Sequence, residues 1–279
     1  MIPPSIPLIL YGTTTGSSIG ELFIAVVIPG LIMMMLFLVT SQVIILKNGY
    51  APIKKKQEEH TEKLKASKVL LEGIPALLSP IIILGTIYTG ICTPTESAII
   101  ACVYSMLIGF FVYRELNPKT FWRAVMNSAE TSAIIMFLIA AASFFGWVMT
   151  SINLTSKITD WLIAVSSSKI VFLLLINAFY LLAGMLMETG TIILLAVPLV
   201  FPVAQAFGID PIHFGIITNI NLAIGLFTPP FGTGVFLMAG KAGLPVASVF
   251  QRIFPFIIAG ILGILVITYC PGISTFLIR

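Results

Sequence analysis

Two short polar segments interrupt otherwise apolar sequence, and they carry the residue types with most chemistry. The first covers residues 89–97 (TGICTPTES) and the second covers residues 225–234 (GLFTPPFGTG). Proline has no amide hydrogen and frees carbonyl oxygens in the preceding turn, while helix ends leave further backbone groups unpaired. Carbonyl and hydroxyl oxygens suit a small hard cation such as Na⁺, and a helix N-terminus suits an anion. The two segments therefore predict binding of a cation and an anion rather than catalysis.

The composition fixes the class of protein. The chain has 279 residues, of which 58% are hydrophobic and only 9% are charged, whereas soluble domains are about 25% charged. A soluble enzyme, a nucleic-acid-binding protein and a disordered chain are thereby excluded. The apolar runs are continuous, which predicts helices rather than the alternating strands of a barrel. We predict an all-α polytopic membrane protein with room for roughly eight to ten segments of about 20 residues.

Charge is concentrated in one hydrophilic segment, residues 47–68, which holds seven of the fifteen basic residues. The positive-inside rule places this segment in the cytoplasm. We favour a solvated connector over a lipid-binding or nucleic-acid-binding segment. The three cysteines have no metal-ligand spacing with the two histidines, and we expect them to be small buried apolar side chains.

Residues 69–113 have basic flanks on both sides, because residues 47–68 precede them and a cluster that starts at Arg114 follows. A single crossing would put one flank outside, against the positive-inside rule. We favour a re-entrant hairpin with its tip at residues 93–96, where irregular backbone must be buried in protein or line a wet cavity. Two full spans joined by an external turn satisfy the charges equally well.

The chain contains an internal echo. Residues 2–12 (IPPSIPLILYG) resemble residues 228–238 (TPPFGTGVFLM), and at this offset the two Pro–Pro pairs align. Pro29 aligns with Pro255 at the same offset, each within an apolar segment that follows the break. Paired breaks in two halves of a hydrophobic chain indicate a secondary transporter with inverted repeats.

Taken together and in this order, the motifs resemble those of one family, the large membrane subunit of tripartite ATP-independent periplasmic (TRAP) transporters. The residues that carry the resemblance are IPPSIPLILYG (2–12), SIGELF (18–23), Pro29-Gly30, ILGTIYTGICTPTES (83–97), YREL (113–116), INAFYLLAGMLME (176–188), GIDPIHFG (208–215) and NLAIGLFTPPFGTGVF (221–236).

The resemblance implies an elevator-type fold, in which two inverted repeats each carry a re-entrant hairpin and a broken helix. It implies Na⁺-coupled symport of an organic anion, such as a C4-dicarboxylate, sialic acid or another carboxylate, in the bilayer of the bacterial inner membrane. A periplasmic binding protein would deliver the substrate and a small membrane subunit would brace the scaffold. The resemblance implies no enzymatic activity, no catalytic residue, no nucleic-acid partner and no cofactor besides Na⁺.

The family also implies a stretch before the IPPS motif that carries the hairpin of the first repeat, and the sequence starts after it. We therefore expect residues 1–46 to end the first repeat, residues 47–68 to connect, and residues 69–279 to form the second repeat. The first part would be truncated or supplied by another chain. Two alternatives to the transporter subunit are a non-transporting remnant and a symporter of similar architecture that needs no binding protein.

The resemblance assigns residues to two kinds of site. The predicted Na⁺ ligands are Gly90, Thr93, Thr95, Gly225, Thr228 and Phe231. The predicted substrate contacts are Pro4, Ser5, Thr95, Asn221 and Pro230.

Several of these polar residues also have a purely structural interpretation. A threonine at the tip, Thr95 above all, is suited to cap the second helix of the hairpin, and Glu96 fits either an anchor of the tip or a coupling role. Asn219 and Asn221 fit either a substrate contact or a link between helices. We favour a surface turn for Glu188. Asp210 and His213 are expected to form a structural turn.

Overall fold

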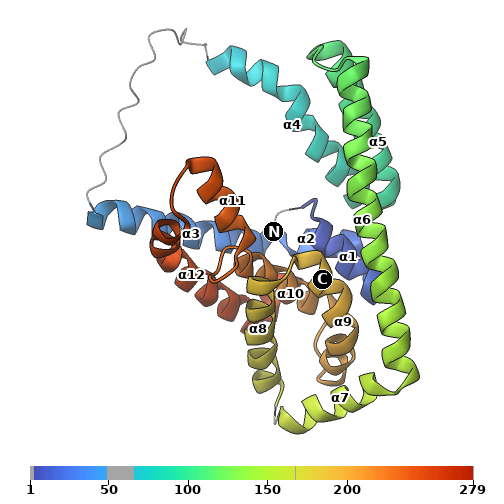
Figure 1. Cartoon of the computed structure of the whole chain (residues 1–279), viewed down its shortest axis with the longest axis vertical. Coiled ribbons are helices and arrows are strands. Elements are labelled where there is room, and N and C mark those ends of the chain that lie inside the picture. Colours follow the sequence, from blue (N-terminus) through green and yellow to red (C-terminus); the bar gives the residue numbers. More distant parts are fainter. Residues whose placement is uncertain (1–2, 49–65, 167, 279) are drawn as a thin grey trace. The chain divides into compact units, whose positions relative to one another are not determined.

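The computed structural model describes residues 3–48, 66–166 and 168–278 (Figure 1). It contains two compact units, which are treated separately below. One consists of Met1–Ser41 together with Ile134–Arg279, and the other consists of Gln42–Ala133. Most of the predicted cytoplasmic connector lies outside the described residues, so its side of the membrane stays a prediction.

Every regular element in the described residues is a helix, which confirms the predicted all-α membrane protein. The helices are α1 (Ile6–Thr15), α2 (Ile19–Ala25), α3 (Val27–Asn48), α4 (Ala66–Tyr88), α5 (Pro94–Leu107), the π-helical turn η1 (Ile108–Val112), α6 (Pro118–Ser151), α7 (Leu154–Val165), α8 (Lys169–Leu186), α9 (Thr189–Ala206), α10 (Pro211–Gly225), α11 (Thr233–Ala242), α12 (Val246–Tyr269) and α13 (Pro271–Thr275).

Six segments of the described chain are long and apolar enough to cross a membrane. They are Ile19–Lys47, Pro94–Val112, Pro118–Ser151, Lys169–Leu186, Thr189–Ala206 and Val246–Tyr269. This is fewer than the eight to ten for which the composition leaves room. Among the described residues, α1 and α11 have 10 residues each, α10 has 15, and the apolar part of α4, Gly73–Tyr88, is also shorter than a full span.

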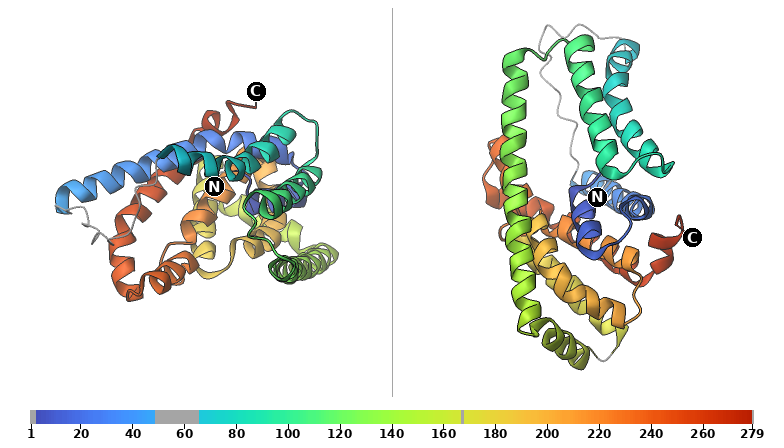
Figure 2. Two further views of the ribbon diagram at one scale, coloured as in Figure 1. Left: turned by 90° about the horizontal axis from the view of Figure 1, so that it is seen from above. Right: turned by 90° about the vertical axis from the view of Figure 1, so that its right-hand side faces the viewer.

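The smaller unit is built around a helical hairpin, in which α4 and α5 pack side by side (Figure 2). The Tyr104 hydroxyl donates to the Pro75 carbonyl at 2.8 Å, and the Ser97 hydroxyl donates to the Ile83 carbonyl at 3.0 Å. These bonds tie the two helices together at both ends of the contact. A pair of packed helices is expected both for a re-entrant hairpin and for two full spans, so this packing does not decide between the two arrangements.

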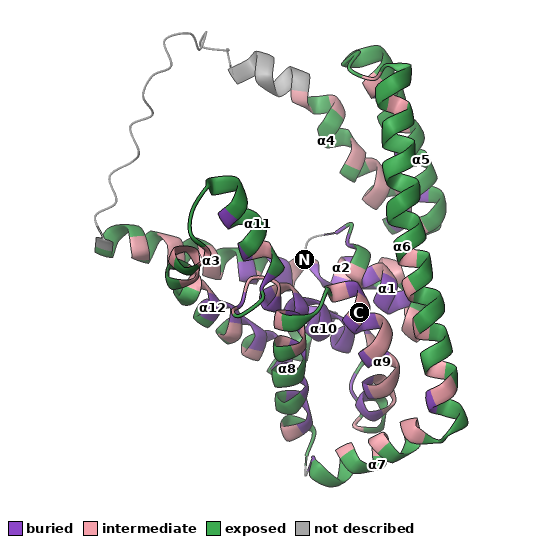
Figure 3. Ribbon diagram, viewed as in Figure 1, coloured by how far each residue is buried: buried purple, intermediate pink, exposed green. Residues whose placement is uncertain are grey.

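The core of the larger unit is α10, which is buried along nearly its whole length (Figure 3). It packs against α1, α2, α8, α9, α12 and α13. A helix without a solvated polar face is stable only when it is surrounded, and even the polar side chains of α10, namely His213, Thr218, Asn219 and Asn221, are buried. The break at the end of α10 is therefore held in place by the most densely packed part of the unit.

The internal echo corresponds to two segments that each contain a 10-residue helix followed by a long apolar helical span, although the span of the first segment is divided into α2 and α3. After Pro4 comes the 10-residue helix α1, which ends at Gly16 with φ of 72°, and then α2 and the long helix α3. After Pro230 comes the 10-residue helix α11, which ends at Gly243 with φ of 63°, and then the long helix α12. The inverted orientation of the repeats and the elevator movement stay predictions.

Candidate functional site

The second break lies between α10 and α11, where residues 226–232 form a tight irregular turn. The amide of Thr228 donates to the Gly225 carbonyl at 3.0 Å, and the amide of Gly234 donates to the Leu226 carbonyl at 3.0 Å. Thr228 is buried, and its hydroxyl donates to the Ile224 carbonyl at 2.7 Å. Because its only proton is used in this bond, the Thr228 hydroxyl offers lone pairs to any further ligand.

Gly232 marks a point at which carbonyl oxygens converge. A Cβ atom on Gly232 would lie 2.8 Å from the Thr228 oxygen and 2.9 Å from the Leu226 oxygen. Gly232 therefore lies against two carbonyl oxygens that any larger side chain would meet too closely, and converging carbonyl oxygens favour a cation. Gly232 is not among the residues predicted from the sequence, although its position directly after TPPF is a signal of close backbone approach.

The break packs against the end of α8 through two glycines. A Cβ atom on Gly225 would lie 2.7 Å from the Cα of Gly184. Gly184 is three residues before Met187, where α8 ends and the turn into α9 begins. The second break thus packs against the last turns of α8, which lead into the turn before α9. Gly184 is not among the residues predicted from the sequence.

Glu188 begins α9 as its N-cap. Its carboxylate accepts hydrogen bonds from the amides of Gly190 at 3.1 Å and Thr191 at 3.3 Å. This satisfies donors that the first turn of a helix leaves unpaired. The turn position expected for Glu188 is confirmed, and its function there is to cap.

The turn between α4 and α5 is closed by a capping box. The Glu96 carboxylate accepts from the amide and from the hydroxyl of Thr93, both at 2.8 Å, and the Glu96 amide donates to the Thr93 hydroxyl at 3.3 Å. Glu96 thus anchors the tip. The cap is Thr93 rather than Thr95, because Thr93 immediately precedes the first helical residue, Pro94. Gly90 has φ of 70°, a left-handed conformation that glycine adopts without strain.

The predicted Na⁺ ligands are divided between the two units. Gly90, Thr93 and Thr95 belong to the smaller unit. Gly225, Thr228 and Phe231 belong to the larger one, where Thr228 and Gly225 are buried and the Phe231 side chain is exposed. That the two groups share one ion stays a prediction.

The first break precedes α1. Ser5 is nearly buried and stands at the N-cap position, where its carbonyl accepts from the Ile9 amide at 3.2 Å. Pro4 is exposed, as is Pro230 at the second break. The Pro3–Pro4 and Pro229–Pro230 peptide bonds are both cis. The predicted substrate contacts of Pro4, Ser5 and Pro230 stay predictions.

Asn221 belongs to a buried polar network that joins three helices. Its amide nitrogen donates at 2.8 Å to the Asn177 side-chain oxygen of α8 and at 2.8 Å to the Ile217 carbonyl. Asn177 in turn donates to the Thr268 hydroxyl of α12 at 3.1 Å. Asn221 therefore links helices, one of its two expected roles. The Asn221 side-chain oxygen has no partner among the described residues, and its substrate contact stays a prediction.

Asp210 and His213 form the structural turn that the sequence indicates. The Asp210 carboxylate caps α10 by accepting from the amides of Ile212 at 2.9 Å and His213 at 3.0 Å. A ring nitrogen of His213, Nε2, lies 3.1 Å from the Thr268 carbonyl. The two residues thus fix the start of α10 against α12.

The expectation of buried cysteines is wrong. Cys102 and Cys270 are exposed and Cys92 is partly exposed. Cys102 lies on an exposed face of α5, Cys92 lies in the turn between α4 and α5, and Cys270 lies between α12 and α13. Within the described residues, no group of three His, Cys, Asp or Glu side chains is placed to hold a metal ion.

Comparison with known proteins identifies the family. The model of the tripartite ATP-independent periplasmic transporter DctM component matches residues 1–273. The chain is 36% identical to a C4-dicarboxylate TRAP transporter large permease of Pseudomonas aeruginosa, over 98% of this chain and 63% of that protein. It is 34% identical to a sialic acid TRAP transporter large permease of Vibrio cholerae, over 92% of this chain and 59% of that protein.

A third relative is a 2,3-diketo-L-gulonate TRAP transporter large permease of Escherichia coli, which is 31% identical over 98% of this chain and 63% of that protein. The chain thus spans about three-fifths of the length of these relatives. The family consists of transporter permeases and not of enzymes. With a family match over nearly its whole length and six segments in its described part that are able to span a membrane, this chain is a multi-pass membrane protein of the DctM component family of TRAP transporters.

Proposed function

We propose that the chain is part of a Na⁺-coupled, binding-protein-dependent transporter that imports an organic anion. The observation that carries the proposal is the second break, where the Leu226 and Thr228 carbonyls converge beside Gly232. The buried Thr228 hydroxyl donates its proton to the Ile224 carbonyl, so toward a ligand it can only accept. The substrate class is supported by the relatives, whose names specify C4-dicarboxylate, sialic acid and 2,3-diketo-L-gulonate.

The arrangement of the break supports coupling between cation and anion. The carbonyl oxygens of the turn favour Na⁺, while α11 begins at Thr233, directly after them, and the positive N-terminal end of its dipole favours a carboxylate. In a low-dielectric site each ion lowers the desolvation cost of the other. Binding of Na⁺ therefore raises the affinity for the anion, and by linkage the anion raises the affinity for Na⁺.

In this proposal Thr228, Gly225 and Phe231 bind Na⁺, with Gly90, Thr93 and Thr95 completing the coordination. The substrate residues are Pro4, Ser5, Thr95, Asn221 and Pro230. Transport follows an elevator mechanism in the bacterial inner membrane, with residues 47–68 in the cytoplasm. The partners are a small membrane subunit and a periplasmic binding protein.

The test is uptake of labelled organic acids driven by a Na⁺ gradient. The chain is reconstituted with the small subunit, with and without the binding protein. We expect Na⁺-dependent uptake only when the binding protein is present. Uptake without a binding protein would replace the proposal by the simpler symporter, and loss of all uptake in a correctly assembled complex would leave a non-transporting remnant.

The site assignment is tested in the same assay by Thr228→Ala. We expect the Na⁺ concentration for half-maximal uptake to rise about tenfold, which corresponds to a loss of about 1.4 kcal/mol of binding energy. Thr218→Ala is the matched control. Thr218 lies within α10, is buried as Thr228 is, and likewise donates its hydroxyl proton to the carbonyl four residues earlier, at 2.9 Å. Equal Na⁺ dependence of the two variants would contradict the assignment.

A further inference from the structure

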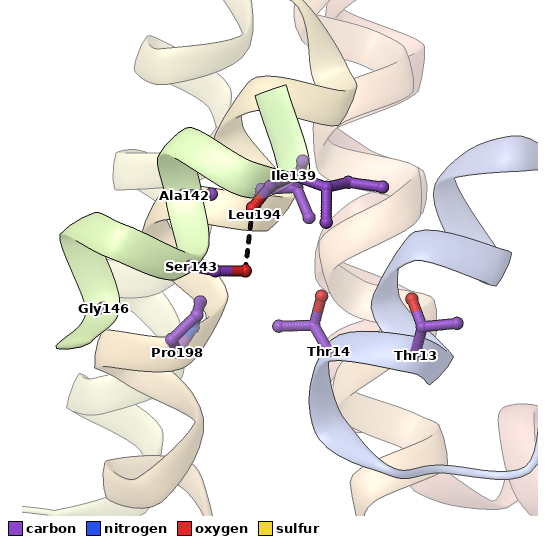
Figure 4. Close-up of a pocket in the computed structure, with 8 residues that line it drawn as sticks. All are labelled: Thr13, Thr14, Ile139, Ala142, Ser143, Gly146, Leu194 and Pro198. Atoms are coloured by element: carbon purple, nitrogen blue, oxygen red, sulfur yellow. Dashed lines mark hydrogen bonds between the residues drawn. The ribbon is translucent and has the colours of Figure 1, made fainter. Parts of the chain in front are cut away.

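A cavity separate from both breaks lies within the larger unit, between α1, α6 and α9 (Figure 4). Its volume is about 300 Å³. The lining residues are Thr13, Thr14, Ile139, Ala142, Ser143, Gly146, Leu194 and Pro198. None of them was singled out as a site residue from the sequence, and none belongs to the proposed Na⁺ or substrate site.

The hydroxyl groups that line this cavity all donate hydrogen bonds to backbone carbonyls of their own helices. The Thr13 and Thr14 hydroxyls donate to the Leu10 carbonyl at 2.9 and 2.7 Å, and the Ser143 hydroxyl donates to the Ile139 carbonyl at 2.8 Å, as Figure 4 shows for Ser143. A hydroxyl has one proton and two lone pairs. All three oxygens are therefore left as acceptors toward a ligand.

The α9 wall of the cavity adds a further acceptor and no donor. Pro198 lies within α9 and has no amide hydrogen, so the Leu194 carbonyl lacks the partner that an α-helix normally provides. Both residues line the cavity. No lining side chain carries an N–H group or a charge. A carboxylate or phosphate, which needs donors or positive charge, finds neither among these side chains.

Water reaches this region along a polar stretch of chain. Thr13 is exposed, and the sequence that follows it, residues 13–18 (TTTGSS), is entirely polar or glycine. On the facing helix, Ser143 is followed by Thr150 and Ser151 at the end of α6. Such stretches belong at the membrane–water interface, because hydrocarbon does not solvate them. An aqueous occupant is favoured over a lipid acyl chain.

We propose that the cavity between α1, α6 and α9 is a hydrated vestibule that takes monovalent cations and excludes anions, through the acceptor oxygens of Thr13, Thr14 and Ser143. The inference is independent of the proposed transport, since it concerns other residues and is tested without measuring uptake.

The test measures how fast introduced cysteines react with charged thiol reagents. Thr14→Cys and Ser143→Cys are made singly in the full chain, with Cys92, Cys102 and Cys270 replaced by serine. Membranes that contain each variant are treated with a trimethylammonium-ethyl or a sulfonato-ethyl methanethiosulfonate. The ratio of the two rates is divided by the same ratio for a simple uncharged thiol in solution. Phe137→Cys is the control on α6, since the Phe137 side chain is exposed away from the cavity.

We expect both cavity cysteines to react, with a normalised preference for the cationic reagent of about tenfold, in line with the concentration of ions in clefts of one polarity. The Phe137→Cys variant should react with neither reagent. Cavity cysteines that are as unreactive as the control would overturn the proposal, because the cavity then holds lipid. A normalised ratio of one, or a preference for the anionic reagent, would overturn it as well.

Discussion

Gly184 of α8 and Gly225 of α10 are in direct backbone contact, so that a Cβ atom on Gly225 would stand 2.7 Å from the Gly184 Cα. In membranes such small-residue crossings let helix backbones approach closely. Here the crossing joins the end of α8 to the residue at which α10 breaks. Glycine at position 225 therefore serves packing, in addition to any contribution of its carbonyl to cation binding.

Gly184→Ala is expected to separate α8 from α10 and to destabilise the protein. The new Cβ atom would lie 3.1 Å from the Gly225 Cα and 3.4 Å from the Leu222 Cα, and backbone atoms do not yield as a flexible side chain does. Overpacking of this kind costs about 1–3 kcal/mol. Thermal unfolding in detergent measures it as a lowered midpoint temperature.

Gly240→Ala is the matched control for Gly184→Ala. Gly240 also lies inside a helix, α11, but a Cβ atom there would meet nothing within 4 Å. Both substitutions gain the same helix propensity, about 1 kcal/mol. The difference between their unfolding midpoint temperatures therefore measures the effect of the α8–α10 contact. Equal midpoints for the two variants would show that the α8–α10 contact is not tight.

The fold class and the breaks were predictable from the sequence because they depend on local composition. Continuous apolar runs impose helices in a membrane, and Pro229 with Pro230 cannot continue the α10 helix. The recurrence of a short helix and then a long apolar span after Pro4 and after Pro230 followed from sequence spacing alone.

Contacts between distant residues were not predictable in this way. Gly184 is one of 22 glycines, and only the three-dimensional crossing distinguishes it. From the sequence, either Thr93 or Thr95 could be the N-cap of the second hairpin helix. Because α5 starts at Pro94, Thr93 is the N-cap. Exposure of Cys102 depends on which face of α5 is packed, and the apolar composition of that helix hides this information.

Gly232→Ala is expected to abolish stabilisation of the protein by Na⁺. The added methyl group would fill the space between the Thr228 and Leu226 carbonyls, at 2.8 and 2.9 Å. The backbone of Gly232 has φ of −49°, which alanine also adopts, so the substitution acts through contact of the methyl group with these backbone atoms. The unfolding temperature in choline measures the resulting destabilisation separately from the response to Na⁺. The measurement is the rise in unfolding temperature when choline is replaced by Na⁺ at constant ionic strength.

Wild-type protein should show this rise and Gly240→Ala should retain it. The Gly232→Ala variant should show none. A Na⁺-dependent rise as large as that of the wild type would mean that the converging carbonyls do not form the cation site.

Asn177→Leu is expected to destabilise the larger unit, because it removes the side chain that links α8 to both Asn221 and Thr268. Interhelical hydrogen bonds in membranes contribute about 1–2 kcal/mol each at most, and the partners left behind are buried. The double variant Asn177→Leu with Asn221→Leu should cost less than the sum of the two single variants. Unfolding midpoints of the four proteins give this coupling, and additive effects would contradict the network.

Glu96→Gln separates the two roles considered for Glu96, anchoring and coupling. In the capping box a single oxygen, Oε2, accepts from both the amide and the hydroxyl of Thr93. Glutamine supplies one such oxygen and also occurs in capping boxes, so the tip keeps its anchor while the charge is lost. We expect Glu96→Gln to keep Na⁺-dependent uptake within about twofold in the reconstituted complex, since the retained hydrogen bonds preserve the cap. Glu96→Ala, which removes the acceptor, should reduce uptake much more. If Glu96→Gln were as impaired as Glu96→Ala, the charge itself would take part in coupling.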